Sequence, residues 1–291
     1  MDSEVTEELV VGPADDAVAE RLADAPGWEE YSARLRDTLW KVVKTTGVES
    51  LEVADLRVPE PLPTRHSSLR NGVELDLAGA IKMVVDMLAG VSPYCDFTAP
   101  GLHIAIGYNG YVNIYMTRGS ADKLADLGRE ALRLQWCNRV PDFPDDIQIV
   151  EASADDSFWT SIRSAAETAV VLLCERWAHG DYGCNWFLLN PDNIDEICQS
   201  VQPRSLLCVA IDPDLHLNPA LKEEDFTAFR APLTPGRLTY AAHHWGVDDL
   251  QELVDQGMNF MVATSDLREL SAVVPDADGV VRGVWMACTQ A

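Results

Sequence analysis

The sequence has few basic residues for its length, and lysine is the scarcer of the two types. Its 291 residues include 22 Lys and Arg against 47 Asp and Glu, which gives a formal net charge of -25. Only five of the basic residues are lysine. Binding to phosphate backbones or to anionic lipid is driven by clustered Lys and Arg. We therefore expect no nucleic-acid partner and no membrane partner.

Long hydrophobic runs and a basic N-terminal segment are also missing. No apolar run approaches the roughly 18 residues that a membrane-spanning helix needs. The sequence begins Met-Asp-Ser-Glu-Val-Thr-Glu-Glu, whereas a secretory signal peptide begins with basic residues. Five of the seven cysteines lie inside apolar segments, where a free cysteine behaves as a small core residue. These features predict a cytoplasmic protein with reduced thiols.

No specific catalytic or nucleotide-binding motif is present. The sequence contains no Gly-x-Ser-x-Gly elbow, no glycine-rich phosphate loop with Lys, no His-Glu-x-x-His and no Cys-x-x-Cys pair. The commonest hydrolase and nucleotide-binding classes therefore lose their support. Enzymatic activity of another kind stays open, and a non-enzymatic role is favoured.

The N-terminal third divides into segments of different composition. Residues 1–30 carry ten acidic side chains and one Arg, which predicts a mobile or loosely docked arm. Residues 31–98 predict a helical N-terminal region, because apolar side chains recur at helical spacing in 28–44 and again in 75–89. Between these helices, 57–72 contains three closely spaced prolines and predicts an extended connector, which we take as the main linker.

A β-hairpin is predicted directly after the helical region. Apolar runs at 102–106 and 111–116 flank Asn109-Gly110, the strongest short signal for such a turn. Ser120 then caps a predicted helix that extends to Leu134.

Residues 99–291 as a whole predict one α+β domain. A second two-strand unit at 170–189, followed by a helix that begins at Pro191 after the cap Asn190, suggests two pseudo-repeated halves. Further along, strands are expected at 205–211, 238–242 and 258–263, a helix at 247–256 and a final hairpin at 273–286. Hairpins require antiparallel pairs, so we expect a mixed or antiparallel sheet with helices packed on it. An α/β barrel-like fold is the alternative.

Two segments of this region carry a resemblance to a known family. They are 188–215, with Leu-Leu-Asn-Pro-Asp-Asn and Cys-Val-Ala-Ile-Asp-Pro-Asp-Leu, and 256–267, Gln-Gly-Met-Asn-Phe-Met-Val-Ala-Thr-Ser-Asp-Leu. They resemble the last barrel strands of the HpcH/HpaI class II aldolases. The resemblance implies two carboxylates that hold a divalent metal, which stabilises an enolate. The second ligand would fall on Asp214, but the first falls on Asn190, where the family has Glu, and the family's N-terminal half is absent.

Several polar side chains are candidate metal ligands or catalytic residues of an enzyme. Asp212, Asp214 and His216 follow the predicted strand 205–211 and supply oxygen and nitrogen ligands of a type that Mg or Mn accepts, although Asp-Pro-Asp is also ordinary turn chemistry. His243 ends another predicted strand, where α/β sites place polar groups, and a capping or surface role is the simpler interpretation. The candidate catalytic residues of an enzyme are therefore Asp214, His216 and His243.

Acidic residues gather in several stretches, some of them close to aromatic side chains. The stretch that we select as the candidate partner-binding surface contains Asp142, Phe143, Asp145, Asp146, Asp155, Asp156 and Trp159. Acidic residues recur at 192–196, 223–225 and 248–255. Charge steers the encounter with an oppositely charged protein, and buried aromatic residues supply binding energy. The alternative is a solvated face with its aromatic residues in the core.

These observations favour a cytoplasmic, non-enzymatic binding protein without a cofactor. We expect an inhibitor of immunity or antitoxin type, which covers the phosphate-binding surface of a basic protein partner with carboxylates. The alternative from another class is a small-molecule enzyme, a metal-assisted lyase of aldolase type with a divalent metal. A structural or secretion-chaperone role is the third hypothesis.

Overall fold

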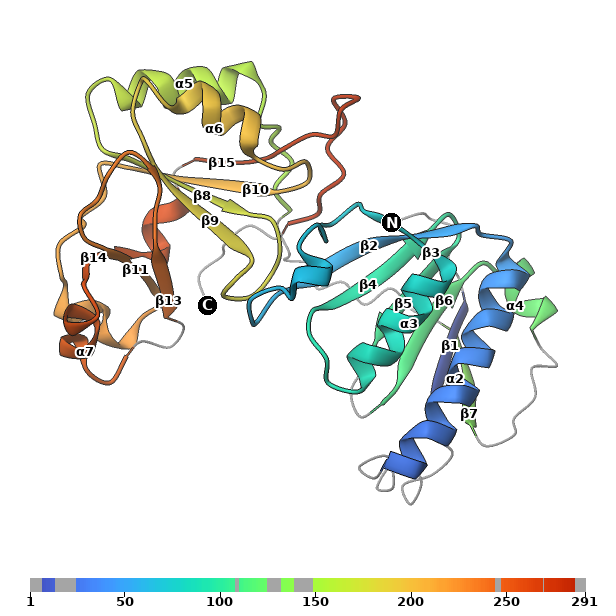
Figure 1. The fold of residues 1–291 in the computed structure, drawn as a ribbon. Helices are drawn as coiled ribbons and strands as arrows, with labels where there is room; N and C mark the ends of the chain where they lie inside the picture. Colours follow the sequence, from blue (N-terminus) through green and yellow to red (C-terminus); the bar gives the residue numbers. More distant parts are fainter. Residues whose placement is uncertain are drawn as a thin grey trace. The chain divides into compact units, whose positions relative to one another are not determined.

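The chain folds into two compact units, which are unit 1, Met1–Phe143, and unit 2, Pro144–Ala291, in a computed structural model of the protein (Figure 1). The residues that the structure describes are 7–13, 25–107, 110–124, 132–138, 149–243, 247–268 and 270–285.

Unit 1 is built on a seven-stranded sheet in the order β3-β2-β4-β5-β6-β1-β7. Every neighbouring pair of strands in it is antiparallel. Its elements in chain order are β1 (Glu7–Pro13), α2 (Ala25–Thr46), β2 (Ser50–Arg57), η1 (Thr64–His66), β3 (Glu74–Asp76), α3 (Leu77–Leu88), β4 (Tyr94–Ala99), β5 (Leu102–Ile106), β6 (Val112–Met116), α4 (Arg118–Lys123) and β7 (Leu132–Asn138).

β1 lies inside this sheet, between β6 and β7. Its side chains Leu9 and Val11 are completely buried. The acidic composition of 1–30 predicts a mobile arm. Residues 7–13 instead form a strand inside the sheet. The pairing of β1 with strands about 100 residues away along the chain supplies hydrogen bonds that the composition of the segment cannot indicate.

α2 and α3 pack against each other and cover one face of the sheet (Figure 1). The helices predicted at 28–44 and 75–89 are confirmed. The predicted apolar stripe of α2 is buried, as are Ile81 and Val84 of α3. The sheet contributes the fully buried Phe97 and Ile114, so the core of unit 1 lies between its helices and its sheet.

The predicted hairpin is confirmed, since β5 pairs with β6 from Leu102↔Met116 to Ile106↔Val112. Asn109 of its turn lies outside the described residues. The helix that follows differs from the prediction. α4 has Thr117 at its N-cap, so Ser120 lies within the helix, and Leu134 belongs to β7. Pairing of β7 with β1 overrides the helical spacing of the apolar residues there.

The proline-rich segment 57–72 joins β2 to β3, which are hydrogen-bonded neighbours in one sheet. It is therefore an internal connection of unit 1 and not the main linker that its prolines predict. The boundary between the two units lies between residues 143 and 144. The helical region expected at 31–98 likewise contributes three strands to the sheet of unit 1.

Unit 2 contains a five-stranded sheet in the order β12-β9-β8-β10-β15 and a three-stranded sheet in the order β13-β11-β14. All pairs in both sheets are antiparallel. Its elements are α5 (Asp156–Ala166), β8 (Val171–Arg176), β9 (Cys184–Leu189), α6 (Ile194–Ser200), β10 (Leu206–Ile211), η2 (Pro219–Glu223), β11 (Phe226–Arg230), β12 (Gly236–Arg237), β13 (Tyr240–His243), α7 (Leu250–Asp255), β14 (Met258–Ala263), η3 (Thr264–Arg268) and β15 (Leu270–Val273).

The elements of unit 2 stack in four layers. α5 and α6 cover one face of the five-stranded sheet, and the three-stranded sheet covers the other (Figure 1). Because alternate residues of a strand point to opposite faces, Leu173 packs toward the helices while Leu172 and Cys174 pack toward the second sheet. α7 and η2 close the outer face of the three-stranded sheet, where Leu253 and Leu221 join one apolar cluster.

Two predictions for unit 2 need correction. α6 begins at Ile194, three residues later than the predicted start at Pro191. The Asn193 side chain accepts the Asn190 backbone N–H at 2.9 Å, and the Asn190 side chain accepts the Asn193 backbone N–H at 3.0 Å. These bonds close a turn before the helix starts. The final hairpin at 273–286 is not found in the described residues. β15 ends at Val273 and pairs with β10, and the chain after it carries no strand up to residue 285.

The described residues form an α+β protein, as predicted, and the barrel-like alternative is wrong for them. Their strands form three open sheets of antiparallel pairs, whereas a barrel of the aldolase kind closes a parallel sheet. β10 and β14, which carry the resemblance to the aldolases, lie in two different sheets. The two hairpins β5–β6 and β8–β9 belong to different units, whose sheets differ in strand number and order.

Candidate functional site

A cavity of about 270 Å³ lies in unit 1 between α3 and the segment that joins β2 to β3. Backbone hydrogen bonds hold this segment against β2, from Val53 N to the Val73 carbonyl at 2.9 Å and from Gly72 N to the Val53 carbonyl at 2.8 Å. On the other side, Asp76 starts α3 by accepting the Gly79 backbone N–H at 2.6 Å. The C-terminal part of the segment is thus fixed between β2 and the start of α3, and the segment encloses space against the helix.

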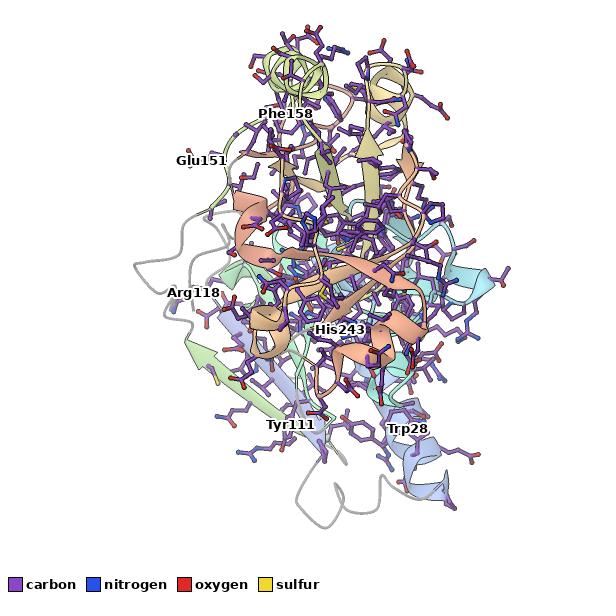
Figure 2. The ribbon with its side chains drawn as sticks, turned by 90° about the vertical axis from the view of Figure 1, so that its left-hand side faces the viewer. Trp28, Tyr111, Arg118, Glu151, Phe158 and His243 are labelled. Carbon is purple, nitrogen blue, oxygen red and sulfur yellow. The ribbon has the colours of Figure 1, made fainter. Side chains whose placement is uncertain are left out.

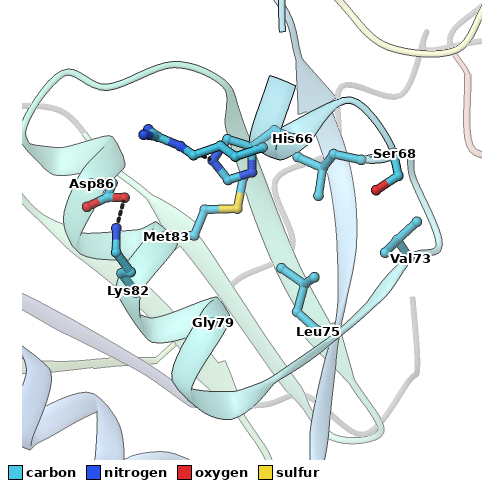
Figure 3. A pocket seen from close by; sticks show the side chains of 10 residues that line it. His66, Ser68, Val73, Leu75, Gly79, Lys82, Met83 and Asp86 are labelled. Atoms are coloured by element: carbon cyan, nitrogen blue, oxygen red, sulfur yellow. Dashed lines mark hydrogen bonds and ion pairs between the residues drawn. The ribbon is translucent and has the colours of Figure 1, made fainter. Parts of the chain in front are cut away.

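The cavity has a charged end and an apolar end. Figure 3 shows Lys82 and Asp86 together at one end and Val73 and Leu75 at the other, with Met83 between them. The apolar wall also includes Leu69. Leu69 and Met83 are only 4% and 5% exposed, so this wall is continuous with the core of unit 1.

Arg65 and His66 of η1 complete the charged end. The Arg65 Nε donates to the His66 Nε2 at 3.1 Å, so the imidazole is neutral with its proton on Nδ1. Burial lowers the pKa of His66, the Arg65 guanidinium lowers it further, and Asp86 opposes this shift. Lys82 forms an ion pair with Asp86 one helical turn later. Near neutral pH this end therefore holds two cations and one carboxylate.

This arrangement is better suited to binding a ligand than to the catalysis that the sequence suggests for Asp214, His216 and His243. Cations beside an apolar wall hold a ligand that has a negative group and an apolar body. The sequence does not single out this site, because the prolines of 57–72 predict a linker there. A signal was present, since Arg65 stands next to a histidine in an acidic chain and Lys82 interrupts the apolar run of α3.

The selected acidic stretch is only partly described. Asp142, Phe143, Asp145 and Asp146 lie outside the described residues. Asp155 and Asp156 are exposed at the start of α5, and Asp155 is the N-cap of this helix. Trp159 is 4% exposed and belongs, with its neighbour Phe158, to the core of unit 2. Figure 2 shows Phe158 on the inner side of α5. These two aromatic side chains therefore belong to the core and are not surface anchors.

A larger set of acidic side chains comes together around η2 and α7. All its members are exposed, and Leu221 of η2 and Leu253 of α7 share one apolar cluster beneath them. We call this set the η2–α7 surface, which consists of Glu223, Glu224, Asp225, Asp248, Asp249, Glu252 and Asp255. The sequence shows the two acidic stretches, and the fold brings them onto one layer of unit 2.

The proposed metal ligands of the enzyme alternative do not form a site in the structure. Asp214 Oδ1 accepts the His216 backbone N–H at 3.1 Å and lies 2.8 Å from the His216 Nδ1, and both side chains are exposed. These bonds to His216 lower the pKa of Asp214. Asp212 is exposed and has a φ of 50°. Within the described ranges, no three His, Cys, Asp or Glu side chains are placed to hold a metal ion. The geometry is that of a turn.

His243 packs against an aromatic residue. Its ring stacks on Phe226 of the neighbouring strand β11, with centroids 4.9 Å apart and planes 20° apart. β13 pairs with β11 so that the two residues are direct partners. His243 thus contributes to the packing of the three-stranded sheet. Its partner Phe226 directly follows Asp225, a residue of the η2–α7 surface.

Two cysteines on neighbouring strands, Cys174 on β8 and Cys184 on β9, belong to the same apolar cluster. Burial raises the pKa of Cys174, while the Cys174 thiol and then Arg176 lower the pKa of Cys184. The six cysteines that the structure describes are free, and Cys288 lies outside the described residues.

No protein-family model, no curated protein and no solved structure matches this chain. Of the helices in the described ranges, none combines the length and the apolar character that crossing a membrane requires.

Proposed function

We propose that this chain is a non-enzymatic binding protein that captures a basic protein partner through its carboxylates. In its most specific form, the proposal is an immunity or antitoxin type of inhibitor, which covers the cationic surface of a toxin or nuclease. We further propose that it acts in the cytoplasm. The observation that carries the proposal is the η2–α7 surface.

The η2–α7 surface has the features that such capture needs. Seven exposed carboxylates lie on two short segments above one shared apolar cluster. The stretches 217–225 and 247–257 contain a single basic residue, Lys222, so little positive charge offsets them. A dense field of one sign raises the association rate with an oppositely charged protein.

An exposed apolar side chain lies on the same stretch of chain as the acidic residues of η2. Leu217, two residues before η2, is 38% exposed although it is a large hydrophobic residue. Apolar contact at the centre of a charged rim is the usual source of binding energy in protein interfaces. Leu217 therefore replaces Trp159 as the proposed anchor, because Trp159 is committed to the core.

The test first isolates a basic protein partner by pull-down with the full chain, and then measures the association kinetics of the two proteins by stopped-flow fluorescence. Raising NaCl from about 0.05 to 0.5 M should slow association at least tenfold, because salt screens steering over about a Debye length. The triple variant Glu223→Gln, Glu224→Gln and Glu252→Gln should slow association several-fold at low salt, with an unchanged melting temperature.

A matched triple variant serves as the control. Glu167→Gln, Asp192→Asn and Glu196→Gln remove the same three charges from exposed positions on the side of α5 and α6. This control should change the association rate less than the η2–α7 triple variant does. An association rate that responds neither to salt nor to the η2–α7 substitutions would exclude this surface as the binding site.

A further inference from the structure

The cavity between η1 and α3 has the size of a site for a small ligand. Its volume of about 270 Å³ is close to the lower end of the range for ligand pockets, roughly 300–1,000 Å³. Its wall reaches the core through Leu69 and Met83, so an apolar group that entered would leave water.

Charge is separated along the cavity. Lys82 and Asp86 lie at one end and Val73 and Leu75 at the other (Figure 3). A ligand that matches this pattern has one polar end and one apolar end. A uniformly polar ligand would leave the aliphatic wall unused, and a hydrocarbon would leave the remaining N–H donors of Arg65 and Lys82 unused.

The donors at the charged end match an anionic oxygen group. Arg65 uses its Nε on His66, and within the described residues no group accepts a hydrogen bond from its Nη1 or Nη2. Two parallel N–H groups of a guanidinium suit a carboxylate. Lys82 engages Asp86 with one of the three protons of its ammonium group, so it also keeps donors for a ligand.

We propose that this cavity binds a small carboxylate with an unbranched apolar tail, of the medium-chain fatty acid class. The carboxylate lies against Arg65 and Lys82, and the tail lies along Met83, Val73 and Leu75. The site lies in unit 1 and does not depend on the acidic surface of unit 2.

The experiment titrates the full chain at pH 7 with butanoate, hexanoate and octanoate by isothermal titration calorimetry. Each added methylene that leaves water should raise the affinity about fourfold, until the tail fills the cavity. The uncharged probe 1-octanol should bind at least tenfold more weakly than octanoate. The ring resonances of His66, assigned with the His66→Gln variant, should shift when octanoate is added, which places the ligand at this end of unit 1.

Two variants test the cations Arg65 and Lys82, and a third variant with the same change of charge is the control. Arg65→Gln and Lys82→Gln should each weaken octanoate binding about tenfold, with the folding unchanged because both side chains are exposed. Lys41→Gln removes one positive charge from an exposed position on α2 and should leave the affinity unchanged. Val73→Phe should fill the apolar end and abolish binding of octanoate while the circular dichroism spectrum is kept.

The proposal is overturned if octanoate does not bind the wild-type chain. It is also overturned if the affinity does not depend on tail length, or if Arg65→Gln, Lys82→Gln and Lys41→Gln all bind octanoate equally well.

Discussion

Arg204 holds the last described segment of unit 2 against the turn before β10. Its guanidinium pairs with Asp276 at both oxygens, Nε to Oδ1 at 3.0 Å and Nη2 to Oδ2 at 3.1 Å, and both side chains are less than a fifth exposed. Arg282 contacts the same carboxylate at 2.7 Å, and the two cations lower the pKa of Asp276, Arg204 more strongly. The Arg204 carbonyl accepts the Trp285 Nε1–H at 2.8 Å. Side chains thus fix a segment that has no strand pairing.

Gly283 is the position where this contact leaves no room for a side chain. A Cβ there would lie 2.6 Å from the backbone oxygen of Arg204 and 3.0 Å from Val273 Cγ1. Gly283→Ala should therefore lower the free energy of unfolding by about 1–3 kcal/mol, because a packed backbone cannot move away without strain. Urea unfolding followed by Trp fluorescence measures this effect.

The control for this substitution is Gly119→Ala in α4, where a Cβ would meet no atom within 4 Å. It should leave stability unchanged or raise it slightly, since Ala favours helix. Equal stability of the two variants would show that the approach of Gly283 to Arg204 is not tight in solution.

At the scale of elements, α5 depends on a single capping side chain. Asp155 Oδ1 accepts the backbone N–H groups of Ser157 at 2.9 Å and Phe158 at 3.1 Å, and the Ser157 hydroxyl at 2.7 Å. The bond from the Ser157 hydroxyl, followed by the backbone bonds, lowers the pKa of Asp155. The residue that the sequence assigns to a partner-binding surface thus begins the helix that carries Phe158 and Trp159.

Asp155→Ala should lower the melting temperature of unit 2 by about 3 °C, because two N–H groups of α5 lose their acceptor. Asp155→Asn keeps the cap and should stay close to wild type at pH 7. The folded-state pKa of Asp155 is lowered, so the contribution of its charge is present above the ordinary Asp pKa and is lost as the pH falls toward the lowered value. Calorimetry from pH 7 to about pH 3 should therefore show a steeper loss for wild type than for Asp155→Asn. A wild-type melting temperature for Asp155→Ala would contradict the capping role.

At the scale of the whole molecule, each unit has a core of its own. In unit 1 this core lies between the seven-stranded sheet and α2 with α3, and in unit 2 it extends through the layers on both faces of the five-stranded sheet. Each unit has about 145 residues, which is an ordinary size for an independent domain. The strand pairs of every sheet also stay within one unit.

We therefore expect the fragments 1–143 and 144–291 to fold separately. Each should show a cooperative thermal transition by circular dichroism, and the sum of their spectra should reproduce that of the full chain. The dispersed amide resonances of each fragment in an NMR spectrum provide an independent check. A fragment that remains unfolded would show that its core needs the other unit.

The local sequence pattern is sufficient to predict the elements that have a long apolar period or a strong turn signal. The stripe of α2, the apolar face of α3 and the Asn109-Gly110 hairpin follow from residues close together in sequence, and the structure contains all three. β14 has the predicted bounds, Met258–Ala263. The α+β class follows from these elements, because hairpins between helices imply antiparallel sheets.

Only the tertiary structure decided what each apolar face packs against. β1 looks like an acidic tail until β6 and β7 pair with it, and Trp159 looks like a surface anchor until the sheet of unit 2 buries it. Arg65 and Lys82 meet at one cavity because the segment 57–72 folds back onto α3. The period of the apolar residues indicates which side chains are buried. It does not indicate which residues they pack against, because these lie far apart in the chain. The sequence by itself therefore determined the charge, the class of fold and its regular elements, while strand partners and candidate sites came from the fold.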